Sequence, residues 1–376
     1  LTQAQLNIRE LIKCYGDGGK FLFSAFNNFS PKDTMKFFEK LGVKLKVESN
    51  GRVFPKNDSA KDVVNALEKF LHDSGVEARL EANVKTIKIL NRVQDDKGHC
   101  GNKGWEVELA SGEQIRARNL IIATGGLSYP HTGSTGAGFD WARAFGHKVV
   151  EAVPALVPIK VKEKWVEQLR GVSLKDAELI AVCKNKKIVQ ERGQILFTHF
   201  GLSGPAVLNS SKKMVSARRA GAVEIFINFF PELTKVELDK KLQDEFKKEG
   251  SKLLKNVLNI LLPHALAETV LEIAKIKAER KAAEVTKAER IRILDLLSEF
   301  KLTMDCDLGY SSSMVTAGGV DLSEVDQKTM RSKIHDNLYF TGEVLNIDGP
   351  TGGYNLQIAW STGFVAGSAV GCHSRS

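Results

Sequence analysis

Apolar and polar residues follow helical and strand periods through the first third of the chain. Residues 31–41 (PKDTMKFFEKL) predict a helix that Ser30 caps and Pro31 begins, and residues 59–73 have the apolar spacing of an amphipathic helix. Strands are predicted at 43–47, 76–80, 84–90, 105–109 and 115–123. This succession of helices and strands predicts an α/β domain with an attached β-meander.

The pattern changes after residue 152. Strands are predicted at 153–161, 177–183, 188–197 and 223–229, with a helix at 205–215 and a mostly helical, Lys/Glu-rich stretch at 233–300. We therefore expect an inserted α+β substrate domain at residues 155–304. It would divide the first domain into residues 1–154 and residues 305–376.

The amino-acid composition is that of an ordinary globular protein and does not by itself indicate a function. A hydrophobic fraction of 43% and a charged fraction of 26% are ordinary for a globular protein, and no apolar run is long enough to span a bilayer. The net charge of +9 suits anionic ligands, although surplus lysine can also serve solubility alone.

Cysteine usage and the first residues bear on the compartment. Five scattered cysteines without a CxxC pair favour a reducing compartment and argue against a disulfide scaffold or a zinc ribbon. The start lacks both Met and the pattern of a signal peptide, so we expect a fragment of a longer chain. The expected location is the cytoplasm, with an organelle left open by the missing N-terminus.

Two segments combine a short strand with glycines. One is 119–126 (NLIIATGG), and the other is 337–371, which runs from LYFTGE through GPTGGYN into an apolar helix. Strand ends and helix N-termini of α/β sheets hold phosphates and cofactor rings, because free N–H groups and the helix dipole point there. Together the segments predict a dinucleotide site, most simply for a flavin, although a plain turn explains ATGG equally well.

The second segment carries the more specific chemistry. Glu343 follows a strand and can accept hydrogen bonds from a ribityl or ribose hydroxyl, although a surface glutamate is the common alternative. The start of the last helix can present N–H donors to the electron-rich edge of a flavin. Gly363, Gly367 and Gly371 recur every four residues, and we expect them to pack this helix closely against a sheet.

Longer motifs resemble a known family. ATGGLSYPHTGSTGAGFDWARAFGH, LFTHFGLSGPAVLNSS, MVTAGGVDLSEV and LYFTGEVLNIDGPTGGYNLQIAWSTGFVAG are similar to segments of the HI0933-like (BaiN/YhiN-type) flavoproteins. The resemblance implies a discontinuous, Rossmann-like FAD-binding domain of the α/β class, interrupted by a substrate domain. It also implies FAD contacts at Val84, Ala123, Thr124, Gly125, Gly126, Gly342, Glu343, Gly352, Gly353, Tyr354, Asn355 and Leu356.

One departure from the family pattern is clear. The family opens with a strand, a GxGxxG turn and a helix, whereas this chain contains no GxGxxG. We expect an N-terminally truncated sequence, because loss of a central buried strand would leave unpaired backbone in a natural domain. The alternative is a chain that has lost tight FAD binding.

Candidate catalytic groups are few. His199, within LFTHFG, is suited to proton transfer near neutral pH, although a histidine satisfied at a domain interface is equally plausible. Tyr129 and His131 follow ATGG and can line the ring. No set of His, Cys or carboxylate residues has the spacing of metal ligands.

The leading hypothesis is an FAD-dependent oxidoreductase that transfers hydride through flavin N5 to or from an unidentified small organic substrate. The resemblance implies NADH or NADPH as co-substrate. The alternative is a flavin-free relic that binds nucleic acid or a partner protein through the basic stretch 275–292. Glu279, Glu284 and Glu289 interleave that stretch, so a solvated helix explains it better and nucleic acid is an unlikely partner. No membrane partner is expected, and the oligomeric state is open.

Overall fold

The computed structural model describes residues 1–4, 7–90 and 104–373. The chain divides into two compact units: unit 1 is Leu1–Ala152 with Val315–Ser376, and unit 2 is Val153–Met314. Among the described residues, no helix is long and apolar enough to cross a membrane.

Helices of unit 1 begin where the sequence supplies caps. Ser30 and Asp33 form a reciprocal capping box at one helix start, and the Ser59 side chain accepts a hydrogen bond from Asp62 N at another. The helices of this unit are α1 (Ile8–Lys13), α2 (Gly19–Asn28), α3 (Pro31–Lys40), α4 (Ala60–Asp73), α5 (Ala137–Ala144) and α11 (Tyr354–His373).

The strands of unit 1 form small sheets. The antiparallel sheet β1-β3-β2 contains β1 (Thr2–Gln3), β2 (Leu45–Val47) and β3 (Arg52–Pro55), and the antiparallel sheet β4-β5-β6 contains β4 (Val84–Leu90), β5 (Gly104–Leu109) and β6 (Gln114–Ala117). The remaining pairs are β8 (Val149–Ala155) with β15 (Val315–Val320), and β7 (Leu120–Ile122) with β16 (Leu338–Phe340), the latter parallel.

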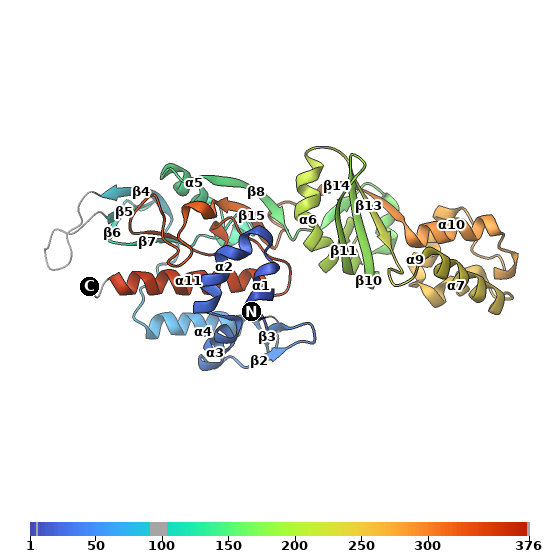
Figure 1. The fold of residues 1–376 in the computed structure, drawn as a ribbon, viewed down its shortest axis with the longest axis horizontal. Helices are drawn as coiled ribbons and strands as arrows, with labels where there is room; N and C mark the ends of the chain where they lie inside the picture. Colours follow the sequence, from blue (N-terminus) through green and yellow to red (C-terminus); the bar gives the residue numbers. More distant parts are fainter. Residues whose placement is uncertain (5–6, 91–103, 374–376) are drawn as a thin grey trace. The chain divides into compact units, whose positions relative to one another are not determined.

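The core of unit 1 lies where α2 and α11 meet these strands (Figure 1). Phe26 of α2 and Phe340 of β16 are fully buried there, and Ile358 and Ala366 of α11 are buried with them. The helix and the parallel strand pair therefore share one apolar core, which fixes α11 beside the strand ends.

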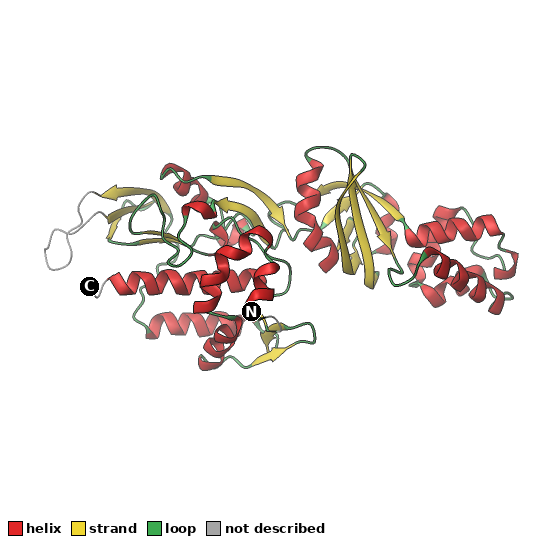
Figure 2. Ribbon diagram, viewed as in Figure 1, coloured by secondary structure: helices red, strands yellow, loops and turns green. Residues whose placement is uncertain are grey.

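Unit 2 contains a closed antiparallel barrel with the strand order β10-β11-β12-β9-β14-β13. Its strands are β9 (Ile159–Val161), β10 (Ser173–Cys183), β11 (Lys186–Phe197), β12 (Gly201–Ser203), β13 (Val223–Asn228) and β14 (Phe300–Asp307). The helix α6 (Pro205–Arg218) packs on β10 and β11, and the others of this unit are α7 (Lys235–Lys248), α8 (Leu254–Leu261), α9 (His264–Ala274) and α10 (Lys287–Ser298) (Figure 2).

Most predicted elements are present, with instructive differences. The predicted strand 76–80 is wrong: this segment forms no strand, and Val76 and Leu80 are 51% and 90% exposed. The single strand predicted at 115–123 is two strands, β6 and β7, because the chain changes sheets between them. The predicted domain boundary at 304/305 falls inside β14, which pairs with β9 and β13 of the barrel.

The expected close packing of the glycine face of α11 is also wrong. A Cβ atom added at Gly363 or Gly367 would meet no atom within 4 Å among the described residues, and both glycines are exposed. The helix instead buries its opposite face through Ile358, Val365 and Ala366. Contacts among the described residues therefore do not explain why these two positions are glycine.

This difference yields a stability prediction. Gly367→Ala should stabilise the protein by about 0.5–1 kcal/mol, because alanine lowers the entropy lost on helix formation and meets no neighbour. Urea unfolding followed by circular dichroism measures the change. The control is Gly19→Ala in α2, where the added Cβ would lie 1.8 Å from Ile12 O and should destabilise. Destabilisation by Gly367→Ala would show that this face is packed.

Candidate functional site

The parallel pair β7 and β16 brings the two glycine-bearing segments together. Leu338 pairs with Leu120, Tyr339 with Ile121 and Phe340 with Ile122 in parallel register. Both strands therefore end at the same edge of the sheet. The turn at 123–126 and the pair Gly342-Glu343 follow these ends directly, as the sequence predicts for a cofactor-binding edge.

Gly126 lies against Thr316 and Glu343 with no room for a side chain. A Cβ atom at Gly126 would lie 2.5 Å from Thr316 Oγ1 and 2.7 Å from Glu343 Oε1. Thr316 N donates a hydrogen bond of 3.0 Å to Glu343 Oε1. Three segments far apart in the sequence thus meet at one point, and glycine at 126 is a steric requirement.

Thr316 holds this point together. Its side chain is fully buried, and Oγ1 accepts hydrogen bonds from Leu127 N at 2.8 Å and Ser128 N at 3.1 Å. Our sequence reasoning missed this residue. The sequence did offer one indication of it: Thr316 carries the lone hydroxyl in strand β15 (VTAGGV), whose other residues are apolar or glycine. A buried hydroxyl requires hydrogen-bond partners.

Glu343 is a partly buried carboxyl group. Burial raises its pKa above the ordinary glutamate value and Asp348 adds to this rise, while hydrogen bonds from the backbone and side chain of Thr316 oppose it. A carboxylate has about four acceptor positions, and Thr316 fills at most two of them. The group can therefore accept hydrogen bonds from ligand hydroxyls, which fits the role expected beside a ribityl chain.

The glycine-rich loop 132–138 packs onto the same turn. Gly136 N donates to Gly126 O at 3.1 Å, and a Cβ atom at Gly125 would lie 2.8 Å from Ser134 Oγ. At Gly138 a Cβ atom would lie 2.1 Å from Thr124 Oγ1. Ala123 is exposed beside these contacts. The structure therefore brings Ala123, Thr124, Gly125 and Gly126 together with a loop whose glycines permit close backbone approach.

The helix α11 connects this cluster to the second predicted group of glycines. Gly342 N donates to Thr362 Oγ1 at 3.0 Å, and Gly342 faces Ala359, whose Cβ would lie 3.8 Å from an added Cβ. At the helical rise of 1.5 Å per residue, Tyr354 at the start of α11 lies about 8–12 Å along the axis from these contacts.

The start of α11 is held by contacts within unit 1. A Cβ atom at Gly353 would lie 2.5 Å from Thr2 O, and Gly352 faces the side chain of Arg52. Tyr354 O accepts a hydrogen bond from the hydroxyl of Tyr15 at 3.0 Å. The Asn355 side chain accepts a hydrogen bond from Gly349 N at 2.8 Å and donates one to Gly349 O at 2.9 Å, so both of its polar atoms stabilise this turn. Leu356 is 46% exposed.

Two predicted site residues lie elsewhere. Val84 begins β4 and pairs with Leu109 in the antiparallel sheet. His199 belongs to unit 2, where it is exposed beside Phe200 at a hollow of about 470 Å³. Its turn is well fixed, because Gly201 N donates to Thr198 Oγ1 at 3.1 Å and Thr198 N to Gly201 O at 2.8 Å.

Four prominent hollows of the described residues include neither Gly125 nor Gly352. A cavity shared by these two glycines therefore stays a prediction. What the structure shows is the joining of both groups through Gly342 and α11.

The profile of the HI0933-like protein Rossmann domain matches residues 1–369, which confirms the resemblance and the α/β, Rossmann-like class predicted from the sequence. A 3-dehydro-bile acid delta(4,6)-reductase of Clostridium scindens is 30% identical over 95% of this chain and 84% of its own length. A ribosomal RNA dihydrouridine synthase of Haemophilus influenzae is 30% identical over 93% and 82%, and that of Escherichia coli is 29% identical over 91% and 80%.

The steric requirement at Gly126 can be tested by substitution. Gly126→Ala should destabilise the protein by about 1–3 kcal/mol, because the added methyl group overlaps Thr316 and Glu343. Urea unfolding measures this change, with Gly367→Ala as a glycine-to-alanine control in open space. Equal effects of the two substitutions would contradict the packing described at Gly126.

Burial of Glu343 predicts a specific pH dependence. A carboxyl group whose pKa is higher in the folded than in the unfolded protein costs stability as pH rises through these two values. Glu343→Gln should therefore raise the unfolding temperature of the flavin-free protein relative to wild type, and more so at about pH 7 than at about pH 4.

The control is Asp321, a carboxyl group whose pKa is shifted in the opposite direction to that of Glu343. Lys148 and Ser323 lower the pKa of Asp321 to about 2, so Asp321→Asn should remove stability that wild type gains as pH rises through the range between that value and the ordinary aspartate value. Thermal unfolding across pH measures both variants. A Glu343→Gln protein whose relative stability does not change with pH would contradict the burial of an ionisable group there.

Proposed function

Because the chain belongs to the HI0933-like family, a family of flavoprotein oxidoreductases, we propose that it is an FAD-dependent reductase that saturates a carbon–carbon double bond. The observation that carries the proposal is the convergence of the 123–126 turn, Thr316 and Glu343 at the shared end of two parallel strands. We further propose NADH or NADPH as the electron donor.

The residues at this edge fit FAD. Glu343 would accept hydrogen bonds from the ribityl chain, and Gly125 and Gly126 would let the backbone approach the cofactor. The N-terminus of α11, from Gly352 to Leu356, would face the isoalloxazine ring, and the β4 strand at Val84 the adenine. A bound flavin would supply hydride transfer through N5 between a nicotinamide and the substrate.

Reduction of a double bond also requires a proton. His199 is our candidate for this proton, because imidazole exchanges protons near neutral pH and the side chain is exposed on a fixed turn. This role rests on the chemistry of the residue.

For the substrate we propose uridine in RNA. Two relatives bear the name ribosomal RNA dihydrouridine synthase, and dihydrouridine is uridine with its ring double bond reduced. A net charge of +9 suits an anionic polymer. Our sequence-based expectation that nucleic acid is an unlikely partner considered only the basic stretch 275–292, and this proposal departs from it.

A second candidate is a small unsaturated carbonyl compound of the bile acid type. The relative named as a bile acid reductase matches 95% of this chain. Both substrates present a carbon–carbon double bond, so the flavin chemistry is common to the two and only the recognition differs.

The test uses the protein expressed with any upstream coding sequence that its gene contains. We expect a two-banded flavin absorption spectrum that NADH or NADPH bleaches under anaerobic conditions, and a gain of two hydrogen atoms on uridine in unmodified ribosomal RNA by mass spectrometry. Glu343→Ala should lower flavin retention after dialysis, because it removes the proposed ribityl acceptor.

The outcomes separate the hypotheses. Reduction of a 4-ene-3-oxo steroid without reduction of RNA would select the small-molecule substrate. A folded, colourless protein would remove the flavin proposal and favour the flavin-free binding protein. Full flavin occupancy in Glu343→Ala would contradict the role of that carboxylate.

A further inference from the structure

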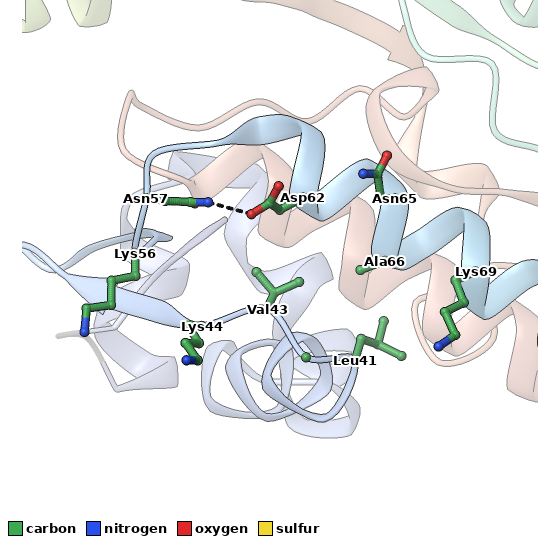
Figure 3. Close-up of a pocket in the computed structure, with 10 residues that line it drawn as sticks. Leu41, Val43, Lys44, Lys56, Asn57, Asp62, Asn65, Ala66 and Lys69 are labelled. Carbon is green, nitrogen blue, oxygen red and sulfur yellow. Dashed lines mark hydrogen bonds between the residues drawn. The ribbon is translucent and has the colours of Figure 1, made fainter.

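A basic hollow lies in unit 1, and its lining residues are distinct from those of the candidate site. It has a volume of about 510 Å³ and is bordered by the segment before β2, the segment after β3 and the helix α4 (Figure 3). Its charged lining residues are Lys44, Lys56, Lys69 and Asp62, with Asn57 and Asn65 beside them. We call it the lysine hollow.

Two of its lysines oppose each other across a strand pair. Leu45 pairs with Pro55 in the antiparallel ladder, and Lys56 N donates to Lys44 O at 2.8 Å, which continues the register by one residue. Residues directly opposite in an antiparallel pair project to the same face, and like charges in such positions are destabilising. The register therefore places two like charges on one face of this strand pair.

Two acids lie near these lysines. Asp58 pairs with Lys46 at 2.6 Å. Asp62 lines the hollow, and hydrogen bonds from Asn57 to its Oδ2 at 2.6 Å and from Ser59 to its Oδ1 at 3.0 Å lower its pKa. Its ionised carboxylate offsets one of the three lysine charges, and the hollow keeps a positive balance. Among the described residues, Lys44, Lys56 and Lys69 have no ion pair or side-chain hydrogen bond.

Two arginines of the basic stretch 275–292 differ from these lysines. There Arg280 pairs with Glu289 at 2.6 Å and Arg290 with Asp239 at 2.8 Å. Those two arginines are engaged in ion pairs, whereas Lys44, Lys56 and Lys69 line one hollow without an ion pair among the described residues. Lysine ammonium groups bind phosphates as point charges, and an anion held between two opposed lysines removes their repulsion.

We propose that the lysine hollow binds phosphate groups of the RNA backbone. The identity of the polymer rests on the proposed function, while the phosphate chemistry rests on the hollow itself. Its other lining residues are Leu41, Gly42, Val43 and Ala66, so no aromatic side chain is present to stack on a base. The contact is therefore independent of sequence and positions the RNA on unit 1.

The test measures RNA binding with the oxidised flavoprotein in the absence of NADH and NADPH. The probe is a fluorescent, single-stranded, uridine-rich RNA, titrated from about 50 to about 200 mM salt. The triple variant Lys44→Gln, Lys56→Gln, Lys69→Gln should bind more weakly. The slope of log K against log salt should fall in magnitude by about 2, because each lost phosphate contact contributes about 0.7.

A matched control removes the same charge elsewhere. Lys277→Gln, Lys281→Gln, Lys287→Gln changes exposed lysines of unit 2 and should leave the slope close to that of wild type. Equal losses in both triple variants would show that net charge alone governs binding and would overturn the proposal. Unchanged binding in the lysine-hollow variant would also overturn it.

Further measurements separate this inference from the proposed function. Reduction of the flavin by NADPH should be the same in wild type and the lysine-hollow variant, and the unfolding temperature should not fall, because the variant removes a like-charge repulsion. If wild type reduces RNA and the lysine-hollow variant has the same KM for RNA, the proposed role of the hollow is wrong and the proposed function stands. If wild type does not bind RNA but NADPH still reduces its flavin, both the RNA substrate and the role of the hollow are wrong, and the reductase proposal stands.

Discussion

The buried hydroxyl of Thr316 is the contact on which the candidate site depends. It accepts hydrogen bonds from the backbone N–H groups of Leu127 and Ser128, and the backbone N–H of Thr316 donates one to Glu343. Through it, strand β15 joins the turn after β7 to the turn after β16. A buried polar group must find partners, so this hydroxyl fixes the relative positions of three segments that are far apart in the sequence.

The arrangement around Glu343 trades stability for binding capacity. A carboxyl group that is desolvated and only partly hydrogen-bonded disfavours its own ionised form. A neutral amide would fill the same space without that penalty, so packing alone does not explain an acid here. A ligand with several hydroxyl groups would supply the missing partners, and this is why we connect the group to a ribityl chain.

The lysine hollow follows the same logic with the opposite charge. Lys44 and Lys56 stand opposed across a strand pair, Asp58 pairs with Lys46, and Asp62 accepts hydrogen bonds from Asn57 and Ser59. Elsewhere in the chain, cations such as Arg280 and Arg290 have carboxylate partners. In both unit 1 sites, a local charge lacks the protein partner that stability alone would favour.

The sequence by itself determined most local elements, the α/β class and the strand-to-glycine segments at 119–126 and 337–371, because caps, periodicity and glycine act over a few residues. It did not reveal Thr316, whose role depends on segments that only the fold brings together. It also misjudged Gly363 and Gly367, since a regular spacing shows which residues share a helix face and not what lies opposite. The tertiary structure decided that the strand ends are parallel neighbours, and that Lys44 and Lys56 stand opposed while Lys46 is paired, because long-range register is set by packing across the whole unit.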